Sequence, residues 1–214
     1  MKNDLCRDLT CKLLSRLFIV TLVCMVVSTP VCAEEKTVAG TESREPCSLS
    51  PISVPKFPDS IPGYTELDPD TGLHVTGTYQ VIDLETYVLE IAGRVEQPRA
   101  LKYDELRCLP RTESRAPLIC PGFFEDNATW SGASLKHVLE QAGVREGATH
   151  IRMVSADGYA ALVEIKEALS GSSFLAYEWE DEPLPILHGF PVRAVFPGLN
   201  GNKWVKWLVR IEVQ

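Results

Sequence analysis

The sequence predicts an α+β fold with a mixed β-sheet and short flanking helices. Strand-like runs of β-branched, aromatic and polar residues outnumber helical patterns, and the two kinds do not alternate regularly along the chain. Neither a GxGxxG sequence nor a phosphate-loop sequence is present. A doubly wound nucleotide-binding fold, which needs regular alternation of strands and helices, is therefore not expected.

The first 33 residues have the pattern of an export signal. A basic leader precedes an apolar core at residues 17–28, and a small-residue cleavage site follows at Val31, Cys32 and Ala33. This core is shorter than the roughly 20 residues that a bilayer span needs. We expect cleavage after Ala33 and a periplasmic or secreted protein with no stable membrane span. A retained N-terminal anchor is the alternative.

Residues 34–71 are predicted to form a proline-rich linker or wrapping arm, because prolines recur there and apolar runs are few. Residues 72–214 are expected to form one domain, long enough for a sizeable core. The net charge is −8, and removal of the basic leader makes the remainder more acidic. Such a chain is a poor binder of nucleic acid, although its surface could dock a basic redox partner.

Strands are expected where β-branched and aromatic residues alternate with polar ones, or where a short apolar run ends at a turn. These segments are residues 73–82, 87–93, 116–120, 150–155, 159–164, 174–178 and 192–196, with one or two more strands within 204–213.

The clearest helix is predicted at residues 133–143. Its apolar residues fall on one face at helical spacing, and Gly143 is suited to end the helix in a left-handed conformation. Shorter helices are expected at residues 103–109 and 165–169.

Three cysteines remain after the leader, namely Cys47, Cys108 and Cys120. An odd number in an exported protein suggests one disulfide and one free or metal-bound thiol. We expect Cys47 to pair with Cys108 and Cys120 to be the functional thiol. A bridge between Cys108 and Cys120 is the alternative.

Cys120 ends an apolar run before Pro121 and Gly122, so its sulfur could face a cavity at the end of a strand. A thiolate is a soft donor suited to a transition metal, and nearby cations would lower the pKa of the thiol. Taken alone, a single cysteine before Pro-Gly is more simply explained as a buried, inert thiol.

The segment from residue 183 to residue 213 carries cations between glycines and prolines. The cationic candidates are His188, Arg193, Lys203 and Lys206. Arginine offers a planar fork for phosphate, lysine acts as a point charge, and glycines let backbone N–H groups approach an anion. This pattern predicts an anion clamp, with a solvated polar loop as the alternative.

From about residue 87 to residue 213 the chain resembles the molybdopterin-binding domain of the sulfite oxidase family. The similar features are YVLEIAG, the Leu109-Pro110 pair, a strand ending in Cys120, a turn with Trp130 and Gly132, and HGFPVRAVFPG followed by KWVKWL. The resemblance implies a molybdenum–molybdopterin cofactor. It gives Cys120 the metal-binding and catalytic role, and gives His188, Arg193 and Lys206, with Lys203 as a further candidate, the pterin and its phosphate.

Three departures from the family pattern affect the expected substrate and cofactor pocket. Phe123, Phe124, Glu125 and Asp126 stand where sulfite oxidases carry sulfite-binding arginines, so a neutral, sulfoxide-like substrate fits this stretch better than sulfite does. LHVTGTY lacks the Arg-Asn cap of relatives, which predicts an open or incomplete pocket. No C-terminal dimerisation domain is expected after Gln214.

The leading functional hypothesis is an exported molybdenum-cofactor oxidoreductase. It would carry out oxygen-atom and two-electron transfer on a small substrate, with a haem or membrane redox partner. The alternative is a cofactor-free periplasmic binding or redox-partner-docking module on the same fold. A hydrolase using Cys120 and His188 is a third hypothesis, for which the sequence contains no recognisable local signature.

Overall fold

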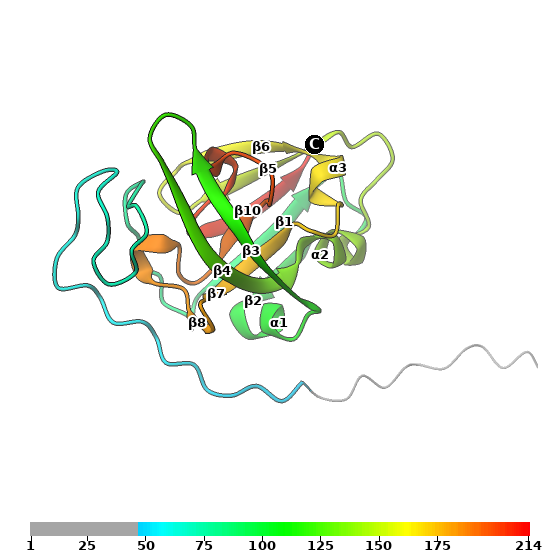
Figure 1. The fold of residues 1–214 in the computed structure, drawn as a ribbon. Helices are drawn as coiled ribbons and strands as arrows, with labels where there is room; N and C mark the ends of the chain where they lie inside the picture. The colour runs from blue at the N-terminus through cyan, green and yellow to red at the C-terminus, as the bar shows by residue number, and fades with distance from the viewer. Residues whose placement is uncertain (1–46) are drawn as a thin grey trace, which may run out of the picture. The chain divides into compact units, whose positions relative to one another are not determined.

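Two β-sheets form the framework of residues 47–214, the part of the chain that this computed structural model describes (Figure 1). The expected signal peptide and the start of the expected arm lie outside the described residues. The first sheet has the order β2-β1-β10-β5-β6. β1 pairs with β10 in parallel and the other pairs are antiparallel, so the sheet is mixed. Its strands are β1 (Val88–Gly93), β2 (Arg99–Lys102), β5 (His150–Ser155), β6 (Ala160–Glu164) and β10 (Leu208–Val213).

The second sheet is antiparallel and is built on a long hairpin. β3 and β4 pair from Arg111 opposite Ala133 to Cys120 opposite Phe124, and β7 continues the sheet on the other side of β4. Both β8 and β9 pair with β7. The strands are β3 (Arg111–Cys120), β4 (Phe124–Ser134), β7 (Phe174–Trp179), β8 (Glu182–Pro183) and β9 (Arg193–Val195).

The described helices are short. They are α1 (Tyr103–Arg107), α2 (Leu135–Ala142) and α3 (Ile165–Ala168), with 3₁₀ turns at Ile186–His188 and Gly201–Lys203. In α2 the Ser134 hydroxyl accepts a hydrogen bond from the His137 N–H, and Gly143 ends the helix with φ 68°. None of the described helices is long and apolar enough to cross a membrane. Mixed and antiparallel sheets with few helices confirm the predicted α+β fold.

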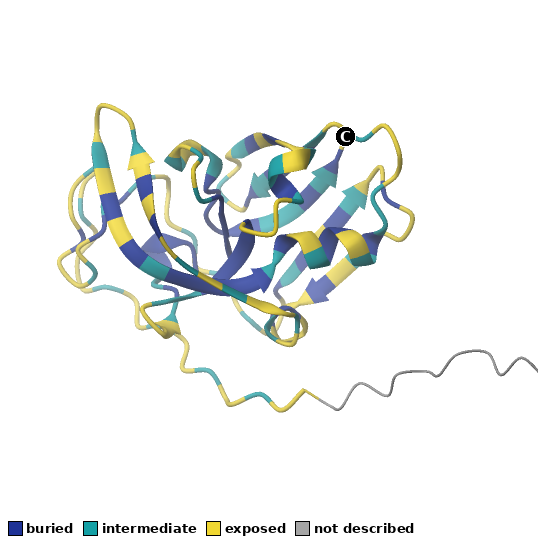
Figure 2. Ribbon diagram, turned by 45° about the vertical axis from the view of Figure 1, so that its right-hand side comes forward, coloured by how far each residue is buried: buried dark blue, intermediate teal, exposed yellow. Residues whose placement is uncertain are grey.

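The core is formed by residues on strands of both sheets, and buried residues are dark blue in Figure 2. Leu89, Ile91 and Ile211 on the first sheet and Phe174 on β7 are fully buried. Burial of apolar surface of this kind is the main source of stability in such a domain. The core therefore gives firm support to the strand ends and loops where the site forms.

The strand predicted at residues 73–82 is wrong. Instead, the chain folds back on the segment before it: Val75 exchanges backbone hydrogen bonds with Thr65 and Glu66, and Leu73 accepts one from Asp68. The N–H of His74 donates to the side chain of Asp126 at 2.9 Å. These hydrogen bonds take the place of the strand pairing that the alternating pattern suggested. Residues 47–86 therefore contain isolated backbone contacts but no strand of either sheet.

The strand predicted at residues 116–120 is the end of a longer strand, β3, which forms a hairpin with β4. Trp130 and Gly132, expected in a turn, lie within β4. A Cβ at Gly132 would collide with the Leu175 carbonyl, so glycine allows β7 to approach closely there. The inward positions of β4 include Asp126 as well as Ala128 and Trp130, and this polar residue hides the period-two pattern. The short strand β2 was also missed.

A disulfide joins Cys47 to Cys108, while Cys120 carries a free thiol. The expected pairing is therefore confirmed and the Cys108–Cys120 alternative is wrong. The bridge ties the start of the described chain to the residue after α1.

Candidate functional site

Cys120, His188, Arg193 and Lys206 line one small cavity of about 30 Å³. β3 delivers Cys120 at its last residue, β9 delivers Arg193 at its first, and the other two lie on the connections after β8 and before β10. A neighbouring cavity of about 260 Å³ shares Cys120, Lys206 and Gly201 with the first. Residues from four separate segments thus meet at the end of the long hairpin.

Cys120 is half-buried, and its sulfur lies close to a glycine. A Cβ on Gly201 would come within 2.7 Å of the Cys120 sulfur, so glycine keeps space open beside the thiol. Burial and the nearby Asp126 raise the pKa of Cys120, whereas Arg193 and Lys206 lower it by a smaller amount. The cations expected to activate this thiol are therefore present but are outweighed. A coordinated metal would deprotonate the thiol directly.

Arg193 is buried with 3% of its surface exposed. Its guanidinium lies 4.5 Å from the centre of the Trp130 ring and donates to the carbonyls of His188 and Trp204 at 3.1 and 3.4 Å. Its Nε is buried and has no hydrogen-bond partner among the described residues. Burial lowers the pKa of Arg193 to about 10. This arginine is positively charged, incompletely bonded and unpaired with any carboxylate in residues 47–214.

Lys206 is the second buried cation. Its ammonium donates to the Leu187 carbonyl at 2.9 Å and to the Thr76 carbonyl, and it lies 4.6 Å from the centre of the Trp207 ring. Burial, and then repulsion from Arg193, lower the pKa of Lys206 to about 7. Buried cations without a carboxylate partner are costly, and the lowered pKa leaves Lys206 only partly charged at pH 7. An anion placed between Lys206 and Arg193 would offset that cost and favour the charged form of Lys206.

His188 is held by two residues of the segment that precedes β1. Its Nε2 lies 2.8 Å from a carboxylate oxygen of Asp68 and 3.0 Å from the Thr71 hydroxyl. Burial, and then the charge of Lys206, lower the pKa of His188 to about 4, although Asp68 acts in the opposite direction. The imidazole is therefore neutral at pH 7 in the protein alone.

Lys203 is not brought to the cavity with the others. Its ammonium donates to the Leu162 carbonyl on β6, at 2.9 Å, and its side chain is half-buried. Asp157 and Tyr159, in the turn between β5 and β6, do line the 260 Å³ cavity.

Of the residues that follow Cys120, some line the site and others face solvent. Phe123 and Glu125 are exposed, but Phe124 stacks on His74 with ring centres 4.4 Å apart. Asp126 is buried, lines the small cavity and lies 2.6 Å from Nδ1 of His74. One of the two carboxylates noted in the sequence thus faces the thiol.

The segment from Asp68 to Thr76 forms part of the site wall, although the sequence predicted an open or incomplete pocket here. His74 and Thr76 line the small cavity, and Asp68 and Thr71 hold His188. Sequence reasoning missed all four residues. The available signal was a run of turn-forming residues, DPDTG, two positions before His74.

A family model described as "Oxidoreductase molybdopterin binding domain" matches residues 76–214. The chain belongs to this family. The match covers both sheets and contains Cys120, His188, Arg193 and Lys206. Family membership implies a molybdenum cofactor. The resemblance to sulfite oxidases is thereby confirmed.

Curated relatives agree with this assignment. The chain is 32% identical over 141 residues to "Uncharacterized oxidoreductase YuiH" of Bacillus subtilis, covering 65% of this chain and 71% of that protein. It is 35% identical over 161 residues to mitochondrial sulfite oxidase of Drosophila melanogaster, covering 62% and 28%. With the sulfite oxidase of Arabidopsis thaliana it is 32% identical over 174 residues, covering 64% and 44%. The chain thus spans less than half the length of these two sulfite oxidases.

The solved sulfane dehydrogenase SoxCD from Paracoccus pantotrophus has a similar fold. The TM-score is 0.61 at 21% identity, and the match covers 88% of this chain and 58% of that one.

The residues of this molybdopterin-binding domain fit the cofactor chemically. A molybdopterin has a sulfur-ligated metal at one end and a phosphate at the other. A free soft thiol, two buried cations and an unbonded guanidinium N–H lie around the same cavity. The thiol suits the metal, and the buried cations suit the phosphate.

Proposed function

We propose that this protein is an exported molybdenum-cofactor oxidoreductase that transfers an oxygen atom and two electrons with a small substrate. One observation carries the proposal: a free thiol faces a cavity beside two buried cations that have no carboxylate partner in residues 47–214. A cofactor-free protein would gain stability from replacing such cations with apolar side chains. Their presence is therefore best explained by an anionic group that binds between them.

Each residue of the site would have a separate task. Cys120 would ligate the molybdenum, Arg193 and Lys206 would bind the phosphate, and His188 would contact the pterin. The bound cofactor supplies the oxygen-atom transfer chemistry. The protein orients the cofactor, and the half-buried position of Cys120 limits access by water. Lys203 lies outside the walls of both cavities and its ammonium bonds to β6, so we assign it no contact with the cofactor.

The larger cavity supports a neutral substrate. Lys206 is the only cation among the residues that line its 260 Å³, and Asp157 and Tyr159 form part of the same wall. An anion such as sulfite would meet the carboxylate of Asp157 without an arginine to bind it. A sulfoxide avoids this repulsion. Its reduction consumes two protons and two electrons and yields a sulfide and water, and the electrons would come from a haem or membrane redox partner.

Metal and pterin content test the proposal most directly. The full chain should be produced in a host that makes molybdenum cofactor and recovered from the periplasm, then analysed by elemental mass spectrometry and pterin fluorescence. We expect near-stoichiometric molybdenum and pterin in the wild type and at least a tenfold loss of molybdenum in Cys120→Ser. Undiminished molybdenum in Cys120→Ser would remove the role of that residue.

A cofactor-free binding module is favoured by one observation, the small volume of about 30 Å³ beside the buried cations. Absence of pterin from wild-type protein made in a cofactor-replete host would favour this second function.

A further inference from the structure

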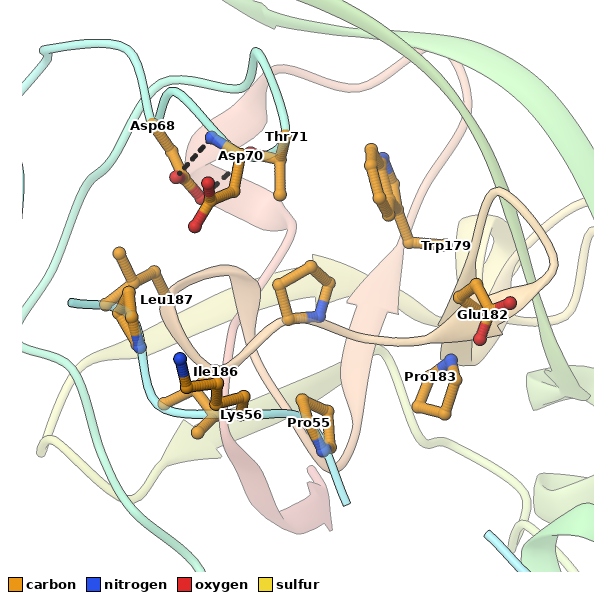
Figure 3. A pocket seen from close by; sticks show the side chains of 12 residues that line it. Pro55, Lys56, Asp68, Asp70, Thr71, Trp179, Glu182, Pro183, Ile186 and Leu187 are labelled. Atoms are coloured by element: carbon orange, nitrogen blue, oxygen red, sulfur yellow. Dashed lines mark hydrogen bonds between the residues drawn. The ribbon is translucent and has the colours of Figure 1, made fainter. Parts of the chain in front are cut away.

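Asp68 is a buried carboxylate that lies before the start of the family match at residue 76. Only 3% of its surface is exposed. It accepts hydrogen bonds from the Asp70 N–H at 3.1 Å and from the Thr71 hydroxyl at 2.9 Å. Figure 3 shows Asp68, Asp70 and Thr71 together at one end of a groove of about 220 Å³. These hydrogen bonds within the turn fix the position of the carboxylate.

From this turn, Asp68 reaches the site through His188, which lies 120 positions further along the chain. One carboxylate oxygen is 2.8 Å from Nε2 of His188, and the Thr71 hydroxyl is 3.0 Å from the same nitrogen. Within residues 47–214, Nδ1 of His188 makes no hydrogen bond. Every bond of this imidazole ring is therefore formed on one of its two nitrogens.

The chemistry of these partners determines which nitrogen carries the proton. An ionised carboxylate can only accept a hydrogen bond, so Nε2 of His188 must donate to Asp68. Burial and the charge of Lys206 keep His188 neutral at pH 7, and a neutral imidazole has a single N–H. With that N–H on Nε2, the Nδ1 atom has a free lone pair and acts as an acceptor.

We propose that Asp68 is a positioning residue of the cofactor site, which fixes His188 as the tautomer with a proton on Nε2 and a hydrogen-bond acceptor at Nδ1. A bare Nδ1 cannot donate to a phosphate. It can accept from a ring N–H or amino group of a pterin, so phosphate binding falls to Arg193 and Lys206. This inference rests on the proposed function, because it assigns the group that His188 binds within the cofactor.

The neighbouring Asp70 provides a matched control. It belongs to the same turn, is exposed, and its side chain makes no hydrogen bond among the described residues. Asp70→Asn removes the same charge two positions away without affecting His188. Asp68→Ala removes the acceptor completely. Asp68→Asn keeps an oxygen that can accept from the Asp70 N–H, so it preserves the turn if the alanine variant fails to fold.

The first measurement is the tautomer of His188 in full-length, cofactor-free protein. Long-range ¹⁵N–¹H spectra of histidine-labelled protein distinguish a protonated from a bare ring nitrogen. We expect His188 to carry its proton on Nε2 in the wild type and in Asp70→Asn, and to populate both tautomers in Asp68→Ala. In Asp68→Asn the amide NH2 takes the place of the oxygen that faces Nε2, so the proton should move to Nδ1. A proton on Nδ1 in the wild type, or an unchanged tautomer in the folded Asp68 variants, would overturn the proposal.

The second measurement is pterin retention after dialysis of protein made in a cofactor-replete host. At metal sites, loss of a carboxylate that orients a ligating histidine typically costs 10- to 100-fold in affinity, and we take the lower end for this histidine. We expect about a tenfold loss for Asp68→Ala, a loss at least as large for Asp68→Asn, and retention within about twofold of wild type for Asp70→Asn. Equal retention in folded Asp68→Ala and Asp70→Asn would overturn the role of Asp68 alone. Absence of pterin from the wild type would instead overturn the proposed function, and with it the cofactor role of His188.

Discussion

The two ends of β3 hold positive charge in opposite ways. At its first residue, the Arg111 guanidinium bonds to Glu178, Glu113 and the Ser131 hydroxyl. Burial alone would lower the pKa of Arg111, but the bonds to Glu178 and Glu113 outweigh it and raise that pKa. At the last residue, Cys120, the nearby cations Arg193 and Lys206 donate only to backbone carbonyls, and burial lowers the pKa of both.

The difference separates a structural cluster from a binding site. The Arg111 cluster is complete, because each charge has a partner of opposite sign at the surface. The Cys120 end is incomplete, because its cations are more deeply buried and yet unpaired in residues 47–214. Proteins rarely retain buried, unpaired charges without a functional reason. One strand thus connects a satisfied ion network to a site suited to an anion.

Replacement of Arg193 should have the largest effect on cofactor binding. In Arg193→Met we expect pterin retention to fall by about a hundredfold, because a charge-assisted fork to the phosphate is lost. The unfolding free energy of the cofactor-free protein should stay within about 1 kcal/mol of wild type, since no carboxylate is left unpaired. Pterin fluorescence and urea unfolding measure the two effects.

Lys203→Met is the control for Arg193→Met, because it removes a cation whose side chain bonds to β6 and lies outside the cavity wall. It should retain pterin at close to the wild-type level. A loss of stability of 3 kcal/mol or more in Arg193→Met, with pterin retained, would mean that Arg193 is a structural cation like Arg111.

Acid should affect the cationic end through His188. The unfolded chain protonates this histidine near pH 6.5, whereas the folded protein resists protonation until about pH 4. The unfolded state therefore binds more protons in this interval, and the unfolding free energy should fall as the pH decreases from 6.5 to 4. The expected loss is on the order of 2 kcal/mol. Lys206 and Arg193 oppose the new charge, while Asp68 partly offsets them.

Urea unfolding at several pH values isolates this contribution. His188→Gln should have a shallower dependence on pH than wild type between pH 6.5 and 4. His137→Gln, which changes a histidine bonded to Gln141 on α2, should follow the wild type. Equal slopes in all three proteins would show that His188 does not titrate as its surroundings predict.

The sequence indicated local features better than long-range partners. The bounds of β5 match the predicted strand, and α2 lies within the predicted helix, because side-chain periodicity and end residues determine both. The predicted association of Cys120 with His188, Arg193 and Lys206 around one cavity followed from residue chemistry and a family pattern.

Other features depend on contacts that no local pattern reveals. Residues 73–82 alternate like a strand but bond to the turn before them and to Asp126. The bond between Asp68 and His188 joins residues 120 positions apart. A carboxylate in a proline-rich arm resembles any solvated residue until the fold buries it. The arm's contribution to the site could therefore be found only from the structure.

Replacement of Arg111, at the other end of β3, should have the smallest effect. Arg111→Gln removes an ion network whose arginine side chain is 43% exposed, so solvent screens much of its energy. We expect the unfolding free energy to fall by about 0.5 kcal/mol and the loss to shrink in high salt. Pterin retention should equal that of wild type, because a satisfied surface charge does not contribute to anion binding at the far end of the strand. A loss of pterin in Arg111→Gln comparable with that in Arg193→Met would show that the two ends of β3 are coupled, and the distinction between a structural cluster and a binding site would no longer hold.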